Sequence, residues 1–158
     1  MTIGFPDPAP VDIQIERQVD QAIRDGHSLP RWGWARPAPY NAHSGAERIF
    51  GWQKMMIAER LGLLGKRGTC TVCAIRRADH RHTESYMRAM VSPSVCRSCH
   101  FHVHRRFRDP GRWMRFVAEV VVADSWATKI KPFELDRQTA IHIAHHPDIF
   151  TALAELPD

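Results

Sequence analysis

The sequence predicts a mainly α-helical protein with one small module held together by a metal ion. Two observations support this prediction. Apolar residues recur at helical spacing over most of the chain, and the only four cysteines occur as two Cys-x-x-Cys pairs. The 158 residues, 44% of them hydrophobic, suffice for one core together with such a module. We expect three regions, at residues 1–68, 69–115 and 116–158.

The amino-terminal region is expected to contain two helices. Residues 4–10 are too rich in proline for regular structure. Residues 11–25 carry apolar side chains on one face and are followed by a glycine, a typical helix stop. Ser44 and Glu47 then match a capping box, which predicts a second helix that ends at about residue 61.

The rest of the chain is also predicted to be helical, apart from a short β-element between the cysteine pairs. One helix is expected over residues 97–107. Asp109 precedes a proline and therefore caps a further helix at 110–122. Two short helices are expected around 134–146 and 147–156. We expect four aromatic residues to form the core beneath the module: Phe101, Phe107, Trp113 and Phe116.

The cysteine pairs, Cys70-x-x-Cys73 and Cys96-x-x-Cys99, are a strong signal for structural zinc. Each pair can present two thiolates to one ion at about 2.3 Å, and four soft ligands suit tetrahedral Zn²⁺. A disulfide framework is the alternative. The second pair and the histidine after it also match the attachment motif for c-type haem, but that reading leaves the first pair unexplained.

The chain shows neither a run of about 18 apolar residues nor a secretory signal at its start. We therefore expect a cytoplasmic protein without a membrane partner. Thiols stay reduced in that compartment, and paired cysteines there bind metal more often than they form disulfides.

Positive charge is concentrated on the segment that carries the cysteines. The net charge of the chain is +5, yet residues 70–115 hold ten arginines, three acidic residues and no lysine. The planar guanidinium group suits bidentate phosphate contacts, so this pattern favours a nucleic-acid partner over a merely solvated basic surface. The candidate phosphate contacts are Arg97, Arg105, Arg106, Arg108 and Arg112.

Two further groups in the amino-terminal region allow two readings each. Trp32 and Trp34 lie in the proline-rich loop 27–43 and either stack on bases or anchor this loop to the core. Arg48 and Lys54 belong to the second predicted helix, which either contacts nucleic acid through them or only packs against the module.

Histidines gather around the second cysteine pair: His80, His82, His100, His102 and His104. His100 and His104 are four residues apart and share one face of the predicted helix, whereas His102 faces away. His142 and His146 have the same spacing, but no acidic residue or cysteine accompanies them. We interpret this later pair as ordinary histidines on a helix surface.

With these residues in view, residues 69–115 resemble the HNH endonuclease family, in particular members whose ββα-metal motif is zinc-stapled by four cysteines. The resemblance rests on the two cysteine pairs, on His-Thr-Glu-Ser-Tyr between them and on Cys-His-Phe-His-Val-His-Arg-Arg-Phe at the second pair. It implies a mainly α fold with a small zinc-stapled ββα-metal module. It also implies a metal-dependent endonuclease that hydrolyses phosphodiester bonds in DNA.

The resemblance assigns metal ligands to particular residues. The four cysteines would hold the structural Zn²⁺. His100, together with His104 and Asp79, would bind a catalytic divalent metal, which is Mg²⁺, Mn²⁺, Ni²⁺ or Zn²⁺. Such an ion neutralises charge on the phosphate and on its leaving oxygen.

The resemblance leaves the general base open between His82 and His80. The pair Asp79-His80 matches members in which an acid binds the metal and the histidine after it is the base. The phrase His82-x-Glu84-x-Tyr86 matches members with a histidine followed by an acid and an aromatic residue. Histidine suits the role because its ordinary pKa of about 6.5 leaves much of it neutral at cellular pH.

The sequence departs from the family at one position. The asparagine that orients the general base, a few residues before the second cysteine pair, is missing. Ser92 and Ser94 lie in that neighbourhood, and the single asparagine of the chain, Asn41, precedes the module. A serine or a backbone carbonyl is the expected substitute. The alternative function is a catalytically inactive, zinc-stabilised module that binds nucleic acid or another partner.

Overall fold

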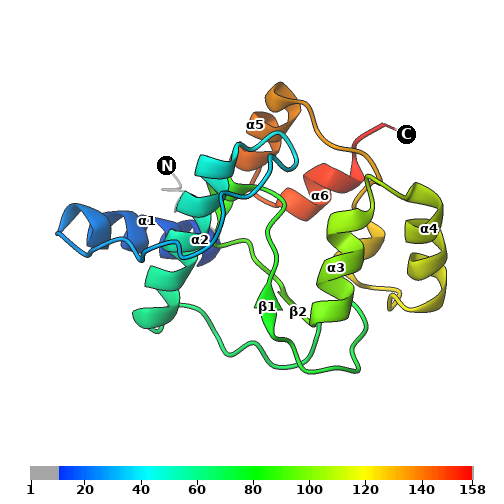
Figure 1. Cartoon of the computed structure of the whole chain (residues 1–158), viewed down its shortest axis with the longest axis horizontal. Helices are drawn as coiled ribbons and strands as arrows, with labels where there is room; N and C mark the ends of the chain where they lie inside the picture. Colours follow the sequence, from blue (N-terminus) through cyan, green and yellow to red (C-terminus); the bar gives the residue numbers. More distant parts are fainter. Residues whose placement is uncertain (1–10, 158) are drawn as a thin grey trace, which may run out of the picture.

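The computed structural model describes residues 11–157, so the proline-rich segment 4–10 lies outside the described residues. The described part is mainly helical, as predicted, with one two-stranded sheet (Figure 1). None of its helices is both long and apolar enough to cross a lipid bilayer. The elements follow one another as α1 (Val11–Arg24), α2 (Gly45–Arg60), β1 (His80–Arg81), η1 (Tyr86–Arg88), β2 (Ser94–Val95), α3 (Arg97–Arg105), α4 (Pro110–Glu119), η2 (Trp126–Thr128), α5 (Arg137–His145) and α6 (Ile149–Ala154), where η denotes a 3₁₀ helix.

Side-chain caps set most of the helix starts. The predicted capping box is present at α2, where Ser44 accepts from the backbone N–H of Glu47 and the Glu47 carboxylate accepts from that of Ser44. Asp109 caps α4, as predicted. This helix ends at Glu119, earlier than expected, because the three valines that follow are poor helix formers. Asp136 caps α5, which therefore starts later than expected.

The expected β-element lies between the cysteine pairs. Strands β1 and β2 are antiparallel, with His80 opposite Val95 and Arg81 opposite Ser94. A hydrogen bond from the His82 N–H to the carbonyl of residue 93 continues the pairing beyond β1. Figure 1 shows both strands beside α3, so the histidines at the end of β1 face those of the helix.

Two hydrophobic clusters hold the described residues together. The larger one surrounds the cysteines and includes Val72, Val103 and side chains of α4, α5 and α6. The smaller one joins α1 and α2 to the segment between the cysteine pairs, through residues that include Val19, Met55 and Met90. Helix η1 therefore packs on the amino-terminal helices, although its residues belong to the region 69–115 that was predicted to form the module.

Only two of the four aromatic residues expected in the core beneath the module are buried there. Trp113 and Phe116 are buried in the larger cluster. Phe107 is half-buried, and Phe101 is 50% exposed. The Phe101 ring lies on the outer surface of α3, where the guanidinium group of Arg105 covers it at 4.5 Å from the ring centroid.

Candidate metal centres

Four buried cysteines converge on one point in the larger hydrophobic cluster. Their sulfur atoms all lie within 4.8 Å of one another, and none of the four forms a disulfide. Tetrahedral coordination with Zn–S bonds of about 2.3 Å places sulfurs about 3.8 Å apart, so the group fits a zinc ion. The set matches the predicted ligands Cys70, Cys73, Cys96 and Cys99.

Backbone N–H groups point at the sulfurs, as expected for thiolate ligands. Cys96 is the N-cap of α3, and its sulfur accepts from the N–H of Cys99 at 3.5 Å. Burial acts to raise the pKa of Cys73, but the N–H groups of Arg76 and Ile75 outweigh it and hold that pKa at about 7. Burial and the neighbouring thiols raise the pKa of Cys99. Coordination to a cation reverses such a shift because it deprotonates the thiol.

A second group of ligand atoms lies where β1 meets α3. Nitrogen atoms of His82, His100 and His104 lie within 4.8 Å of one another, and we call these three residues the histidine cluster. The Nε2 atoms of His100 and His104 are 2.9 Å apart. This confirms that the two helix histidines share a face. Their rings and that of His82 have centroids 4.6–5.3 Å apart.

His82 is the most constrained member of the histidine cluster. Its side chain is 1% exposed, and its Nε2 lies 2.5 Å from Oε1 of Glu84. A carboxylate only accepts hydrogen bonds, so Nε2 of His82 carries a hydrogen. Nδ1 is buried without a hydrogen-bond partner. Metal-bound histidines usually donate their other N–H to a carboxylate, and His82 fits that arrangement.

Burial keeps the other two histidines neutral. It lowers the pKa of His100 to about 3 and that of His104 to about 2, and His82 adds to both shifts. Neutral imidazole is the form that binds a metal ion. The histidine cluster therefore brings together three imidazole rings that could bind one divalent cation, and burial keeps those of His100 and His104 neutral.

Asn41 supports the histidine cluster from outside the predicted module. Its Nδ2 donates to Oε2 of Glu84 at 2.9 Å and to the backbone carbonyl of Glu84 at 3.0 Å, while its Oδ1 accepts from the N–H of Leu135 at 3.0 Å. The fully buried Asn41 adopts a positive φ of 52°, which asparagine tolerates better than most residues. Ser92, an expected substitute, instead donates to the carbonyl of Met90.

Arg106 lies in the interior, not on the surface where we expected a phosphate contact. Its side chain is 2% exposed, and its Nη2 lies 2.7 Å from Oε2 of Glu84. It also donates to the hydroxyl of Tyr40 at 2.6 Å and to the carbonyl of Lys131 at 2.8 Å. Burial acts to raise the pKa of Glu84, but Arg106 and His82 hold it at about 2. Arg106 is therefore the counter-charge that keeps Glu84 ionised.

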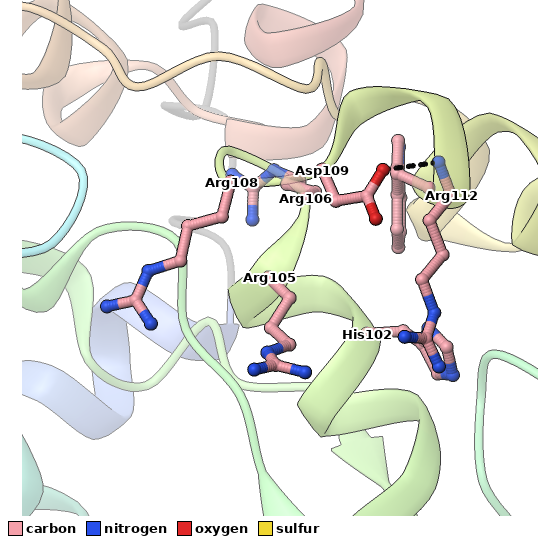
Figure 2. Close-up of a pocket in the computed structure, with 7 residues that line it drawn as sticks. His102, Arg105, Arg106, Arg108, Asp109 and Arg112 are labelled. Carbon is pink, nitrogen blue, oxygen red and sulfur yellow. Dashed lines mark hydrogen bonds between the residues drawn. The ribbon is translucent and has the colours of Figure 1, made fainter.

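The other predicted phosphate contacts are exposed but lie away from the histidine cluster. Arg105, Arg108 and Arg112 line a hollow of about 200 Å³ between α3 and α4, together with His102. Figure 2 shows their side chains leaving the helices in different directions, with Arg112 ending beside His102. The His102 ring stacks on Phe116 at 4.2 Å, so His102 faces away from the cluster as predicted.

Arg97 is exposed at the start of α3, on the turn that carries the second cysteine pair. Lys54, by contrast, is buried and pairs with Glu16 and Asp20, which removes it from the nucleic-acid contacts considered for α2. Arg48, the other basic residue considered on α2, instead lines a cavity beside the histidine cluster.

A cavity of about 170 Å³ opens beside the histidine cluster. All three residues of the histidine cluster line this cavity. Much of the remaining wall comes from α2 and from the loop that precedes α2. We call it the tryptophan cavity; its other lining residues are Trp32, Pro37, Arg48, Trp52, Met55, Arg81, Thr83 and Tyr86. The sequence alone gave no signal that residues of the amino-terminal region would border the histidines.

His80 and Asp79 lie near His100 but do not line the tryptophan cavity. They line a second hollow of about 210 Å³, the His80 hollow, which shares Trp52, Met55, Arg81 and His100 with the tryptophan cavity. The exposed His80 ring has its centroid 5.3 Å from that of His100. The Asp79 carboxylate is not among the ligand atoms that converge in the histidine cluster.

The later histidines do not form a pair. His142 is exposed on α5, whereas His146 lies beyond the end of this helix and its Nδ1 contacts backbone atoms of Asp148. His142 is therefore a histidine on a helix surface, as interpreted, whereas His146 is half-buried and lies outside the helix.

Comparison with known proteins identifies no relative of this chain. No protein family matches it, no curated protein is similar to it, and no solved structure resembles it. The two groups of metal-ligand side chains and their surroundings are therefore the features that indicate a function.

Proposed function

We propose that the protein is a metal-dependent endonuclease of the HNH type that hydrolyses phosphodiester bonds in nucleic acid, with DNA as its substrate. The observation that carries this proposal is the convergence of His82, His100 and His104, with Nδ1 of His82 buried and without a hydrogen-bond partner. The order of two strands and a helix, fixed at its base by four cysteines, is in keeping with a zinc-stapled ββα-metal module.

In this proposal the histidine cluster binds the catalytic cation. A divalent ion held there would stabilise negative charge on the scissile phosphate and on the leaving oxygen. Three imidazole ligands favour Zn²⁺ or Ni²⁺ over Mg²⁺ and Mn²⁺, which prefer oxygen ligands. Glu84 fixes the ring orientation of His82 through the 2.5 Å hydrogen bond, and Asn41 and Arg106 fix Glu84.

His80 is the general base in this proposal. With His82 buried against Glu84 and assigned as a ligand, His80 remains the histidine that is open to solvent beside His100. From that position its neutral ring can take a proton from a water molecule that attacks the phosphate. The choice between His80 and His82 that the sequence left open therefore falls on His80.

Substrate binding in this proposal uses arginines from two surfaces. Arg48 lines the tryptophan cavity and can reach the phosphate nearest the histidine cluster, whereas Arg81, which also lines it, pairs with Glu59. Arg97, Arg105, Arg108 and Arg112 can contact more distant phosphates, which adds salt-sensitive affinity without sequence choice. The four cysteines hold a structural Zn²⁺, and a cytoplasmic location would keep their thiols reduced.

The test is cleavage of supercoiled plasmid and of single-stranded DNA by the zinc-loaded protein, with Mg²⁺, Mn²⁺, Ni²⁺ or Zn²⁺ added. We expect His100→Ala to lose both the second metal ion and cleavage. His80→Ala should lose cleavage and keep the metal. His142→Ala, a surface histidine, is the matched control and should behave as the wild type. Nucleic-acid binding without cleavage under every metal would instead support the inactive zinc-stabilised module.

A further inference from the structure

We propose that the tryptophan cavity binds an unpaired nucleobase, so that the protein cuts single-stranded or locally unpaired nucleic acid in preference to continuous duplex. This inference rests on the proposed function, because it names the substrate class of the same site. It is carried by the aromatic side chains that surround the cavity, by the unpaired charge of Arg48 and by the second hollow beyond His100.

Two neighbouring tryptophans of the loop 27–43, Trp32 and Trp34, meet Trp52 of α2 beside the cavity, whose wall includes Trp32 and Trp52. The ring centroids of Trp32, Trp34 and Trp52 lie 5.0 to 6.0 Å apart, and the rings are close to perpendicular, at 71° to 87°. Trp34 is 68% exposed, although burying an aromatic ring of this size is strongly favourable. Anchoring of the loop to the core explains Trp32 and Trp52, but it does not explain an exposed Trp34.

The loop that presents these rings is held in place. The indole N–H of Trp32 donates to the carbonyl of Ala35 at 3.0 Å, and Gln53 of α2 donates to the carbonyl of Pro30 at 2.8 Å. Trp52 belongs to α2 itself. The aromatic surface is therefore positioned before any ligand arrives, which lowers the entropy cost of binding.

The walls of the tryptophan cavity suit a base better than a sugar-phosphate unit. Trp32, Trp52 and Tyr86 contribute aromatic surface, and Pro37 and Met55 add apolar surface. Every base has a flat aromatic face that can stack on such side chains, and each stack contributes about 1–3 kcal/mol irrespective of sequence. The histidine cluster forms another part of the wall, so a bound base lies within one nucleotide of the proposed cation.

Arg48 gives the cavity a positive charge. Its guanidinium carbon lies 5.4 Å and 5.5 Å from the ring centroids of Tyr40 and Tyr86, and its Nε lies 3.3 Å from the Tyr86 hydroxyl. Within residues 11–157, none of the ion pairs involves Arg48. A phosphate between the base and the histidine cluster would provide the missing partner.

The two hollows give a polynucleotide strand a path past the histidine cluster. The tryptophan cavity and the His80 hollow adjoin through Trp52, Met55, Arg81 and His100. A base in the first cavity places its phosphate near His100 and directs the next nucleotide toward His80. A base that is paired and stacked within a duplex cannot enter such a cavity, so the nucleotide must be unpaired.

The test measures binding separately from cleavage. The affinity of the zinc-loaded protein, without other divalent metal, is measured by fluorescence anisotropy for a single-stranded oligonucleotide, the matching duplex and a duplex with an unpaired bubble. We expect Trp34→Ala to weaken binding to the single strand and the bubble by about 5- to 100-fold. Trp34→Phe should restore most of the affinity, and duplex binding should not change.

Phe101→Ala is the matched control, since Phe101 is an exposed aromatic residue on the outer surface of α3. It should leave every affinity within about twofold of the wild type. Equal effects of Trp34→Ala and Phe101→Ala, or duplex binding as tight as single-strand binding, would overturn the inference. Metal-dependent cleavage of duplex that Trp34→Ala leaves intact would overturn it and leave the nuclease standing. Binding that depends on Trp34 but is never followed by cleavage would support the base-binding cavity and contradict the nuclease.

Discussion

Asn41 and Glu84 are joined by two hydrogen bonds, of 2.9 Å to the carboxylate and 3.0 Å to the backbone carbonyl, across 43 positions of the sequence. Glu84 in turn holds His82 in the orientation that leaves Nδ1 free for a metal ion. Asn41, which lies outside the predicted module, thus supports a histidine that the module provides.

Asn41→Asp tests this relationship with little change of shape. The new aspartate carboxylate would face the carboxylate of Glu84. One of its oxygens would take the place of Nδ2, which donates both hydrogen bonds to Glu84. We expect a loss of about 1–3 kcal/mol in the free energy of unfolding and about 10-fold weaker metal binding at the histidine cluster. Urea unfolding and metal titration measure the two effects. Ser92→Ala is the control, and metal affinity that stays unchanged in Asn41→Asp would refute the positioning role.

Glu84→Gln removes the counter-charge of the buried Arg106 but keeps an acceptor for His82. Leaving a buried charge without its partner costs about 3–5 kcal/mol, so we expect a large loss of stability. Glu119→Gln changes an exposed carboxylate at the end of α4 and should stay within about 0.5 kcal/mol of the wild type. Chemical denaturation of both variants compares their stabilities directly. Equal stabilities would contradict the role of Glu84 as the counter-charge of Arg106.

The stability of the protein should fall as the pH falls below about 6.5. The pKa values of His100 and His104 are about 3 and 2 in the fold, so between these values and 6.5 the unfolded chain binds more protons than the native state. Each histidine then costs up to about 1.4 kcal/mol per pH unit. Unfolding free energies at pH 7, 6 and 5 measure this slope. His142→Ala should not alter it, whereas a flat profile would contradict two buried neutral histidines.

Glu84 should cause a second loss of stability at lower pH. Its pKa is lowered from 4.5 to about 2 by Arg106 and His82, so its stabilising contribution is complete above 4.5 and is lost as the pH falls toward 2. Unfolding measured at pH 5, 4 and 3 should show a steeper loss for the wild type than for Glu84→Gln. Parallel curves for the two proteins would mean that Glu84 is not held ionised by its neighbours.

Loss of the cysteine site should unfold the larger hydrophobic cluster. Cys73→Ser should remove about one zinc ion per chain and much of the helical signal in circular dichroism, because a structural zinc site contributes folding energy outright. Ser98→Ala changes a neighbouring residue that is not a ligand and should keep both. A Cys73→Ser protein that remains folded with its zinc would contradict the assignment.

Local features of the sequence predicted much of the fold. The capping box at Ser44, the proline after Asp109 and the two cysteine pairs act over a few residues, so their structures could be anticipated without knowledge of the rest of the chain. The sharing of one helix face by His100 and His104 followed from helical periodicity in the same way.

Long-range contacts of the candidate site could not be predicted. Asn41 reaches Glu84 only because the loop before α2 packs over η1, and no local pattern records that contact. From the sequence, Arg106 was predicted to be a surface arginine in a basic segment. Its burial could not be predicted because it depends on a carboxylate 22 positions away. The exposed Trp34 became informative only when the tryptophan cavity placed its partners beside the histidine cluster.

The most direct test of the central claim is a titration of Ni²⁺, followed by calorimetry, into protein that carries one zinc ion per chain, at its cysteines. A second metal centre at the histidine cluster predicts one Ni²⁺ site per chain in the wild type, no such site in His100→Ala and an unchanged site in His142→Ala. A wild-type protein that binds only its zinc, or a His100→Ala protein that binds Ni²⁺ as the wild type does, would contradict it.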